Sequence, residues 1–375
     1  MMDRKRILLI LDFYDYRIHR GVAKVAAQEK WSLFFYQNVE NIPEEIKGWK
    51  FDGILTMAYR KATIDHLRTY DTPIVDMGLA DHHLKVHRVV TDNEACGHLA
   101  AEHLFERGYR VGLLGKAMED NDMLNQRNDS FARTFENLGG ETHLFDPLGR
   151  DEKCPNLKTL LERYPQPLAL FATNDNYASH YFIQVSSLGY KVPVEVAIVG
   201  VDNNELVCES IETPLSSVEN DQEGLGEKAA KTLARVIEEL NVSPTGTTTP
   251  TIQWHQPQTI ISRASSNTYV SSDPLVAKAF EWIQEHGCKL VSAVDMAKTL
   301  NISQQQLQLC FKKAGHDSPG KCLERFRLHH AKAYLRYSKE SVKDIASKVG
   351  YSSELSFHRT FKRNEGITPG KWRKI

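Results

Sequence analysis

The feature that most constrains the fold is an internal repeat near the C-terminus, in which residues 294–321 and 343–371 match one another. The matched runs are DMA with DIA (295–297 and 344–346), FKK with FKR (311–313 and 361–363) and SPGK with TPGK (318–321 and 368–371). The offset grows from 49 to 50 residues between the first and second matches, so one residue is inserted within the second copy. A unit that occurs twice predicts a domain built from two similar modules.

Each copy has the pattern of a helix-turn-helix motif. In the first copy Ser292 begins a helix and Asn301 supplies a turn. A second helix then begins with a capping box formed by Ser303 and Gln306. The second copy repeats this order from Ser341 onwards, with glycine at the turn. This compact arrangement is the one that lets a second helix enter the major groove of DNA.

The second helix of each copy leaves a polar face exposed. The positions on or just beyond these faces are Gln304, Gln305 and Gln308 in the first copy, and Ser353, Glu354, Leu355, His358, Arg359 and Lys362 in the second. Glutamine can bind adenine through two hydrogen bonds, and arginine can bind guanine in the same way. The alternative is that these residues simply face solvent in an ordinary helical bundle, but the duplication favours DNA binding.

The charge distribution points in the same direction. From residue 274 to the C-terminus the chain has 19 Lys and Arg against 9 Asp and Glu, a net charge of +10. The whole chain has a formal charge of −1, so residues 1–273 carry −11. Basic side chains that neutralise phosphates release counterions from DNA. A basic terminal domain on an acidic body therefore favours nucleic acid as the partner, although charge alone also fits a solvated basic face.

The remainder of the chain alternates apolar strands with helices. The predicted strands are residues 6–11, 52–57, 73–77, 110–115, 168–173 and 196–201. Continuous apolar strands separated by helices predict parallel sheets covered on both faces, here in a two-lobed α/β domain over 1–262. A serine-rich linker at 263–273 then precedes an all-α domain at 274–375, which begins with Asp273 as N-cap and proline at the first helical position.

Residues 291–373 resemble the DNA-binding domain of AraC-type transcription activators. The residues that carry the resemblance are Ala297, Ser303, Leu307, Phe311, Lys312, Pro319, Arg327, Ala331, Leu335, Ile345, Ala346, Val349, Gly350, Tyr351, Phe357, Phe361, Lys362, Gly366 and Pro369. The resemblance implies a connector helix over 319–337 between the two motifs. It also implies promoter DNA and RNA polymerase as partners, and a homodimer.

Residues 5–262 resemble the effector domain of LacI/GalR regulators, which is itself similar to periplasmic sugar-binding proteins. The matching runs include VTDN (90–93), ATND (172–175), VGVD (199–202) and PLSSV (214–218). The resemblance implies a periplasmic-binding-protein-like fold with a small sugar bound between its lobes. No DNA-binding headpiece precedes the first strand, which departs from that family's order, so the C-terminal motifs would take that role.

In such a fold, polar residues that follow the strands converge on the ligand. Carboxylates, amides and a forked guanidinium suit sugar hydroxyls, and an aromatic ring suits the apolar face of the sugar. Asp12, Tyr14 and Asp15 follow the first strand and are candidates by position, with Phe13 an alternative stacking residue; Asp175 is expected to cap a helix. The resemblance adds Arg127, Asn174 and Asp202 as hydroxyl ligands. Local runs around 272–274 and 288–289 are similar to those of a known regulator of pentose use, and this resemblance implies D-xylose as the leading effector and activation as the outcome.

Two other classes of protein share parts of this pattern. A sugar-processing enzyme could also have two lobes around an acidic cleft. However, the segment 108–117 has Arg110 where a phosphate loop has its first glycine and Ala117 where it has Ser or Thr, and neither G-x-S-x-G nor H-E-x-x-H is present. A transport protein would need secretion, whereas acidic Asp12 and Asp15 follow the short apolar start, so we expect a cytoplasmic protein. The six cysteines show no C-x-x-C spacing, so neither a disulfide framework nor a structural zinc site is expected. No other metal and no cofactor are expected.

Overall fold

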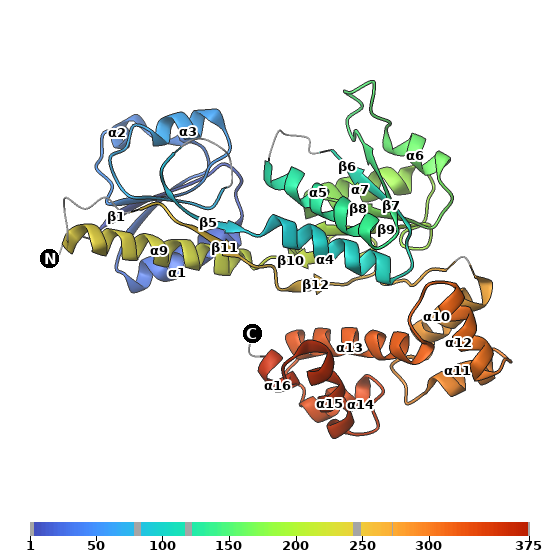
Figure 1. Ribbon diagram of the computed structural model, residues 1–375. Helices are drawn as coiled ribbons and strands as arrows, with labels where there is room; N and C mark the ends of the chain where they lie inside the picture. The colour runs from blue at the N-terminus through green and yellow to red at the C-terminus, as the bar shows by residue number, and fades with distance from the viewer. Residues whose placement is uncertain (1–3, 79–83, 117–121, 243–248, 272, 374–375) are drawn as a thin grey trace.

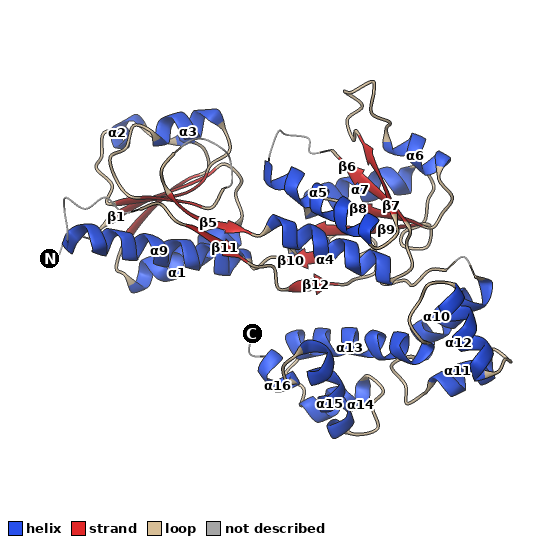
Figure 2. Cartoon of the chain, in the orientation of Figure 1, coloured by secondary structure: helices blue, strands red, loops and turns tan. Residues whose placement is uncertain are grey.

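The computed structural model describes residues 4–78, 84–116, 122–242, 249–271 and 273–373. Two α/β lobes lie next to each other, and an all-helical tail packs beneath the second lobe (Figure 1). Each lobe contains one six-stranded sheet among the described residues, with helices on both faces (Figure 2). This is the predicted two-lobed domain followed by a helical domain.

The sheet of the first lobe is entirely parallel. Its strands lie in the order β11 (Ile252–His255), β5 (His87–Thr91), β4 (Ile74–Asp76), β3 (Gly53–Met57), β1 (Arg6–Leu11) and β2 (Ser32–Tyr36). Its helices are α1 (Tyr16–Gln28), the short 3-10 helix η1 (Val39–Asn41), α2 (Glu44–Lys47), α3 (Lys61–Leu67) and α9 (Gln222–Val242).

Strand β1 shows why this sheet is covered on both sides. Ile7, Leu9 and Leu11 belong to the core that includes α1 and α9. Leu8 and Ile10 point to the opposite face and pack in the core that includes residues of η1, α2 and α3. All five side chains are fully buried. A central parallel strand is buried on both faces, so its sequence is a continuous apolar run, as in residues 7–11, and does not alternate with polar residues.

The second lobe has the same plan, with one antiparallel strand at its edge. The strand order is β12 (Thr259–Ile261), β10 (Ser216–Glu219), β9 (Val196–Val201), β8 (Leu168–Phe171), β6 (Val111–Gly115) and β7 (Glu141–Phe145). The helices are α4 (Asn93–Glu106), α5 (Asp122–Asn137), α6 (Leu157–Arg163), α7 (Asp175–Ser187) and α8 (Glu205–Cys208).

The chain passes between the lobes three times: from β5 into α4, from β10 into α9, and from β11 to β12 (Figure 1). Backbone hydrogen bonds tie these crossings together. The amide of Asp92 donates to the carbonyl of His255 at 2.8 Å, and the amide of Gln258 donates to the carbonyl of Glu219 at 2.7 Å. The crossings therefore form one multi-stranded connection next to the space between the lobes.

The tail consists of α10 (Pro274–His286), α11 (Ala293–Thr299), α12 (Gln304–Lys313), α13 (Pro319–Tyr337), α14 (Val342–Lys348), α15 (Glu354–Glu365) and α16 (Pro369–Trp372). Helix α13 has the bounds predicted for the connector. Its first half packs in the core of the first module, through Phe326 among others, and its second half packs in the core of the second, through Leu335 among others. The two helix-turn-helix modules thus have separate cores joined by one helix.

Local signals placed the ends of these helices correctly. Ser292 and Asp295 form a reciprocal capping box at the start of α11. Asn301 and Gly350 occupy the turns with φ values of +57° and +85°, which asparagine and glycine tolerate better than other residues. The capping box predicted at Ser303 is only half present, because Ser303 accepts from the amide of Gln306 without the return bond.

The segment before the tail is packed against both domains. The amide of Val270 donates to the carbonyl of Arg107 at 2.7 Å, and the Arg107 guanidinium lies over the ring of Tyr269. Arg325 on α13 pairs with Glu106 at the end of α4, at 3.8 Å. The boundaries of the linker stay a prediction.

No helix among the described residues has the length and apolar character needed to cross a membrane.

Candidate effector site and DNA-binding surface

A cavity of about 200 Å³ lies between the lobes, near the carboxyl ends of their parallel strands. Its volume is below the range of drug-sized ligand pockets, so it suits a small molecule. The lining residues come from both lobes and are Phe13, Ile18, Met57, Tyr59, Met77, Thr91, Met123, Leu124, Arg127, Asn174, Asn176, Tyr177, Asp202 and Gln222. Apolar and aromatic side chains surround a few polar groups, which is the usual composition of a small-molecule site.

A buried ion pair stands at one wall of this cavity. Nη1 of Arg127, on α5, lies 3.2 Å from Oδ1 of Asp202, which follows β9. The same Nη1 donates to the carbonyl of Thr173 at 2.7 Å, and Nε donates to Oδ1 of Asn93 at 2.8 Å. Arg127 is 6% exposed. These bonds fix the guanidinium in place, as a recognition group must be fixed before its ligand arrives.

Several polar atoms around the pair have no partner within the described part of the chain. No described residue bonds to Nη2 of Arg127 or to Oδ2 of Asp202. The buried Oε1 of Gln222 and Oδ1 of Asn220 are also without a hydrogen bond there. Buried polar groups are normally satisfied, so such a set indicates a site for a polar ligand that both donates and accepts hydrogen bonds.

Behind this wall lies a carboxyl group with an unusual proton affinity. Asp175 is 2% exposed, and burial, together with the charge of Asp202, raises its pKa to about 7. Hydrogen bonds from Ser217 and from the amide of Asn204 oppose that shift. The prediction that Asp175 caps a helix is wrong. The N-cap of α7 is Asn174, whose Oδ1 accepts from the amide of Tyr177 at 2.8 Å.

The raised pKa predicts how stability depends on pH. The protonated Asp175 contributes to the free energy of unfolding; this contribution is complete below the pKa of an unfolded aspartate, about 3.9, and is lost as pH rises through about 7. Asparagine imitates the protonated form and does not titrate. As pH rises from 5 to 8, the wild type should therefore lose stability relative to Asp175→Asn. Urea unfolding of both proteins across this range measures the difference. A difference that stays constant with pH would contradict the assignment.

The three candidates that follow β1 do not line the cavity. Asp12 accepts from the amides of Tyr59 and Arg60, and from the hydroxyl of Thr63, so it fastens the turn before α3. Tyr14 is 42% exposed and packs against Phe35. In its place the neighbouring Phe13, the alternative stacking residue, lines the cavity.

Asp15 also lies outside the lining. It caps α1 by accepting from the amide of Arg17, and it forms an ion pair with the Arg17 side chain at 2.6 Å. Arg127, Asn174 and Asp202 do line the cavity, and their role as ligands stays a prediction.

Asn93, Asn220 and Gln222, which surround the ion pair, were not among the predicted site residues. They follow β5 and β10, two strands that were not predicted because their sequences, HRVVT and SSVE, are short and partly polar. A search for polar residues after every short strand, including polar strands, would have found them.

The candidate DNA-binding residues lie on α12 and α15, the second helices of the two modules. Gln304, Gln305 and Gln308 are exposed on α12. Arg359 and Lys362 are exposed on α15, whereas Leu307 and Phe357 of the two helices are fully buried in their cores. Each helix therefore presents one polar face while its opposite face is anchored, which is the arrangement that docking in a major groove requires.

Three candidates on the second module have contacts within the protein. The hydroxyl of Ser353 caps α15 by accepting from the amide of Ser356. Glu354 is exposed, and its Oε1 lies 3.6 Å from Nε2 of the partly buried His358. None of these contacts removes the side chains from the surface of α15, and their role in DNA binding stays a prediction.

The fold and the two sites define a DNA-binding transcription regulator with a ligand-sensing domain. Comparison with protein families agrees: residues 296–375 match a helix-turn-helix domain of the AraC type, and residues 101–266 match a periplasmic binding protein-like domain. The relatives and structural neighbours that follow are transcription regulators.

Individual relatives are similar along nearly the whole chain. The chain is 26% identical to the xylose operon regulatory protein of Escherichia coli K12, covering 99% of this chain and 97% of the relative. It is also 26% identical to the protein of that name in Haemophilus influenzae, covering 96% and 95%. The solved structure of a xylose-binding transcription activator is similar over 100% of this chain and 98% of its own, with 23% identity and a TM-score of 0.59.

Proposed function

We propose that this protein is a cytoplasmic activator that senses a small sugar, with D-xylose as the leading effector, and that binds promoter DNA as a homodimer. The sugar occupies the cavity between the lobes. Arg127, Asn174 and Asp202 bind its hydroxyl groups, and Phe13 covers part of its apolar face. The observation that carries the proposal is the unsatisfied polar cluster around Arg127 and Asp202 in a chain similar along its whole length to xylose operon regulatory proteins.

The chemistry of the cavity supports a neutral polyhydroxylated ligand. Because Arg127 and Asp202 already pair with each other, the wall carries little net charge. A charged ligand would therefore leave one partner uncompensated. A sugar can donate to Oδ2 of Asp202 and accept from Nη2 of Arg127 at the same time, without disturbing the pair.

The tail supports the remaining parts of the proposal. It has a net charge of +10 and two modules with exposed polar helices, which suit DNA phosphates and base edges. Promoter binding requires the compartment that holds the genome, and activation requires contact with RNA polymerase. The homodimer is proposed from the resemblance to AraC-type activators.

The test is calorimetry of the full-length protein with D-xylose, L-arabinose, D-ribose and D-glucose. We expect D-xylose to bind most tightly without being converted to a product. A footprint on the promoter next to the protein's own gene, with and without the bound sugar, then measures the DNA response. Failure of all four sugars to bind would refute the sensor role.

A second candidate effector is a different sugar in the same cavity. Structures similar to about 71% of this chain include a LacI family regulator from Enterococcus faecalis with bound ribose, at 20% identity and a TM-score of 0.57, and a regulator in complex with cellobiose, at 21% and 0.56. This fold thus accommodates both monosaccharides and disaccharides. A cavity of about 200 Å³ favours a monosaccharide over a disaccharide.

The two modules should divide the work of binding DNA. Gln308 is exposed on α12, where it can meet a base edge, whereas Lys362 lies in the last turn of α15, where its ammonium can meet a phosphate. Gln308→Ala should relax the preference at one operator position at a cost of about 1–3 kcal/mol, and Lys362→Ala should weaken binding to all sequences alike. Binding to an operator and to random DNA at several salt concentrations measures both effects. Equal losses on the two DNAs for both variants would contradict this division.

A further inference from the structure

The turn that follows β9 has a backbone that few residues adopt without support. Asp202 has a φ of +102° and Asn203 a φ of +44°, so two consecutive non-glycine residues lie in the left-handed region. Such backbone persists only where surrounding contacts hold it. Because the turn carries Asp202 into the cavity wall, whatever holds the turn also determines the geometry of the site.

Part of this support comes from the second lobe itself. The backbone amide of Asn203 donates to the hydroxyl of Ser217 at 2.9 Å, and the side-chain Nδ2 of Asn203 donates to Glu219 at 2.7 Å. The amide of Asn204 donates to Asp175 at 2.6 Å. These bonds attach the turn to β10 and α7 of its own lobe, so they do not depend on where the first lobe lies.

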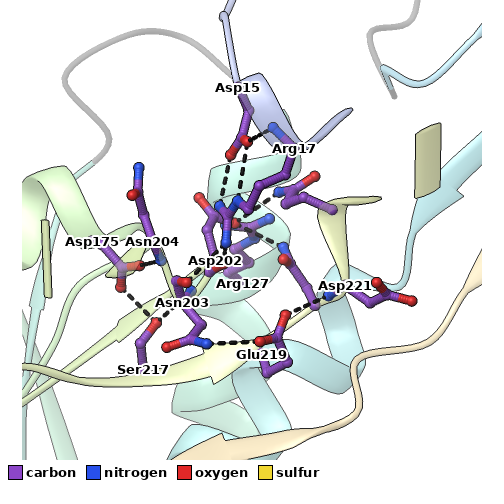
Figure 3. Close-up of polar contacts among 12 residues, drawn as sticks. Asp15, Arg17, Arg127, Asp175, Asp202, Asn203, Asn204, Ser217, Glu219 and Asp221 are labelled. Carbon is purple, nitrogen blue, oxygen red and sulfur yellow. Dashed lines mark hydrogen bonds and ion pairs between the residues drawn. The ribbon is translucent and has the colours of Figure 1, made fainter. Parts of the chain in front are cut away.

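Arg17 provides support from the other lobe. This residue belongs to α1, and its Nη1 donates to the carbonyl of Asp202 at 2.6 Å and to that of Asn203 at 2.8 Å. Asp15 holds the rest of the guanidinium, accepting from Nε at 3.0 Å and from Nη2 at 2.6 Å (Figure 3). The side chains of Arg17 and Asp15 are 10% and 3% exposed. The Arg17 guanidinium thus connects the carbonyls of both positive-φ residues, Asp202 and Asn203, to the first lobe.

We propose that Arg17 is a positioning residue that couples the closed arrangement of the lobes to the shape of the Asp202 turn. When the lobes separate, Arg17 leaves both carbonyls, the turn relaxes, and Oδ1 of Asp202 moves relative to Arg127. When they close, Arg17 restores the turn. The effect on effector affinity rests on the proposed function, whereas the effect on the turn does not.

The chemistry of the contact requires arginine at this position. Its planar fork meets the two carboxylate oxygens of Asp15 with Nε and Nη2 while Nη1 remains for the two carbonyls. Lysine has one nitrogen and cannot reach both sides. Arg20, one turn along the same helix, offers a matched control, because its side chain is 55% exposed and its guanidinium donates to Glu223 on α9.

The experiment is amide hydrogen exchange on the full-length protein without a sugar. In Arg17→Met we expect the amides of residues 202–204 to exchange about 10-fold faster than in the wild type, because local opening becomes easier. Exchange in β8, in the core of the same lobe, should stay unchanged. Arg20→Met should match the wild type in both regions. Asp15→Asn, which removes the charge that orients Arg17, should show the same local change to a smaller degree.

Calorimetry with D-xylose then connects the turn to the effector. Arg17→Met should bind about 10-fold more weakly, which corresponds to about 1.4 kcal/mol, and Arg17→Lys should not restore the affinity. Unchanged exchange at 202–204, or an equal increase in β8, would overturn the proposal. If Arg17→Met does not fold, Asp15→Asn replaces it in the test: unchanged exchange at 202–204, or an equal increase in β8, would then overturn the proposal. If the wild type binds no sugar, the proposed function fails, while the exchange data still decide the role of Arg17.

Discussion

Replacing Arg127 with methionine is expected to weaken D-xylose binding at least 10-fold, a loss of about 1.4 kcal/mol or more. Methionine keeps much of the apolar stem but removes every donor of the guanidinium. The hydroxyl groups of the sugar then lose the partner at Nη2. Oδ1 of Asp202 and the carbonyl of Thr173 lose the bonds that now fix the cavity wall.

The same change should also lower stability, because removing one partner of a buried pair leaves the other charge uncompensated, at a cost of about 3–5 kcal/mol. Calorimetry at a temperature where the variant is folded separates affinity from stability. Arg133→Met is the matched control: Arg133 lies on the same helix, but its side chain is 57% exposed and pairs with Glu94 at 3.4 Å. We expect this control to bind sugar normally. Undiminished binding in Arg127→Met would refute the ligand role.

The second large effect is expected from Phe361→Ala in the second helix-turn-helix module. Phe361 is fully buried among Ile345, Val349, Phe357 and other residues of that module's core. Truncating a buried phenylalanine costs about 3–5 kcal/mol, which is a large share of the stability of a small module. The second module should therefore unfold under conditions where the sensor stays folded, and operator binding should fall sharply.

Urea unfolding, followed by hydrogen exchange in α14 and α15, measures this loss directly. Sugar binding should be unchanged, because the core around Phe361 shares no residue with the cores of the two lobes. Leu355→Ala provides a stability control on the same helix, since Leu355 is 61% exposed. A second module that stays folded in Phe361→Ala would contradict the expected destabilisation.

The helical tail is the part of the fold that sequence patterns predicted best. Helix α13 begins at Pro319 and ends at Tyr337, as predicted, and α11 begins after the capping serine. The reason is physical: caps, turn residues and a buried stripe of period 3.6 act within a few residues along the chain. The repeat strengthened the prediction because each copy showed the same signals independently.

The sheets were predicted only in their centres. The six predicted strands correspond to β1, β3, β4, β6, β8 and β9. The strands that were missed are β2, β5, β7, β10, β11 and β12, which include the edge strands of both sheets. An edge strand such as β7, in which only Phe145 is buried, needs no continuous apolar run, so its sequence carries a weaker signal than that of a central strand.

The sequence by itself determined the classes of the two domains and the duplicated helix-turn-helix module, and its resemblance to sugar-sensing domains suggested Arg127, Asn174 and Asp202 as candidates for one site. Only the tertiary structure decided which polar residues share the cavity. Asp12 and Asp15 follow a strand as the candidates in the second lobe do, yet their carboxylates bind backbone amides and Arg17 instead. Arg17 meets the Asp202 turn across 185 residues. Such contacts exist only after both lobes have folded and closed, and no pattern along the chain records them.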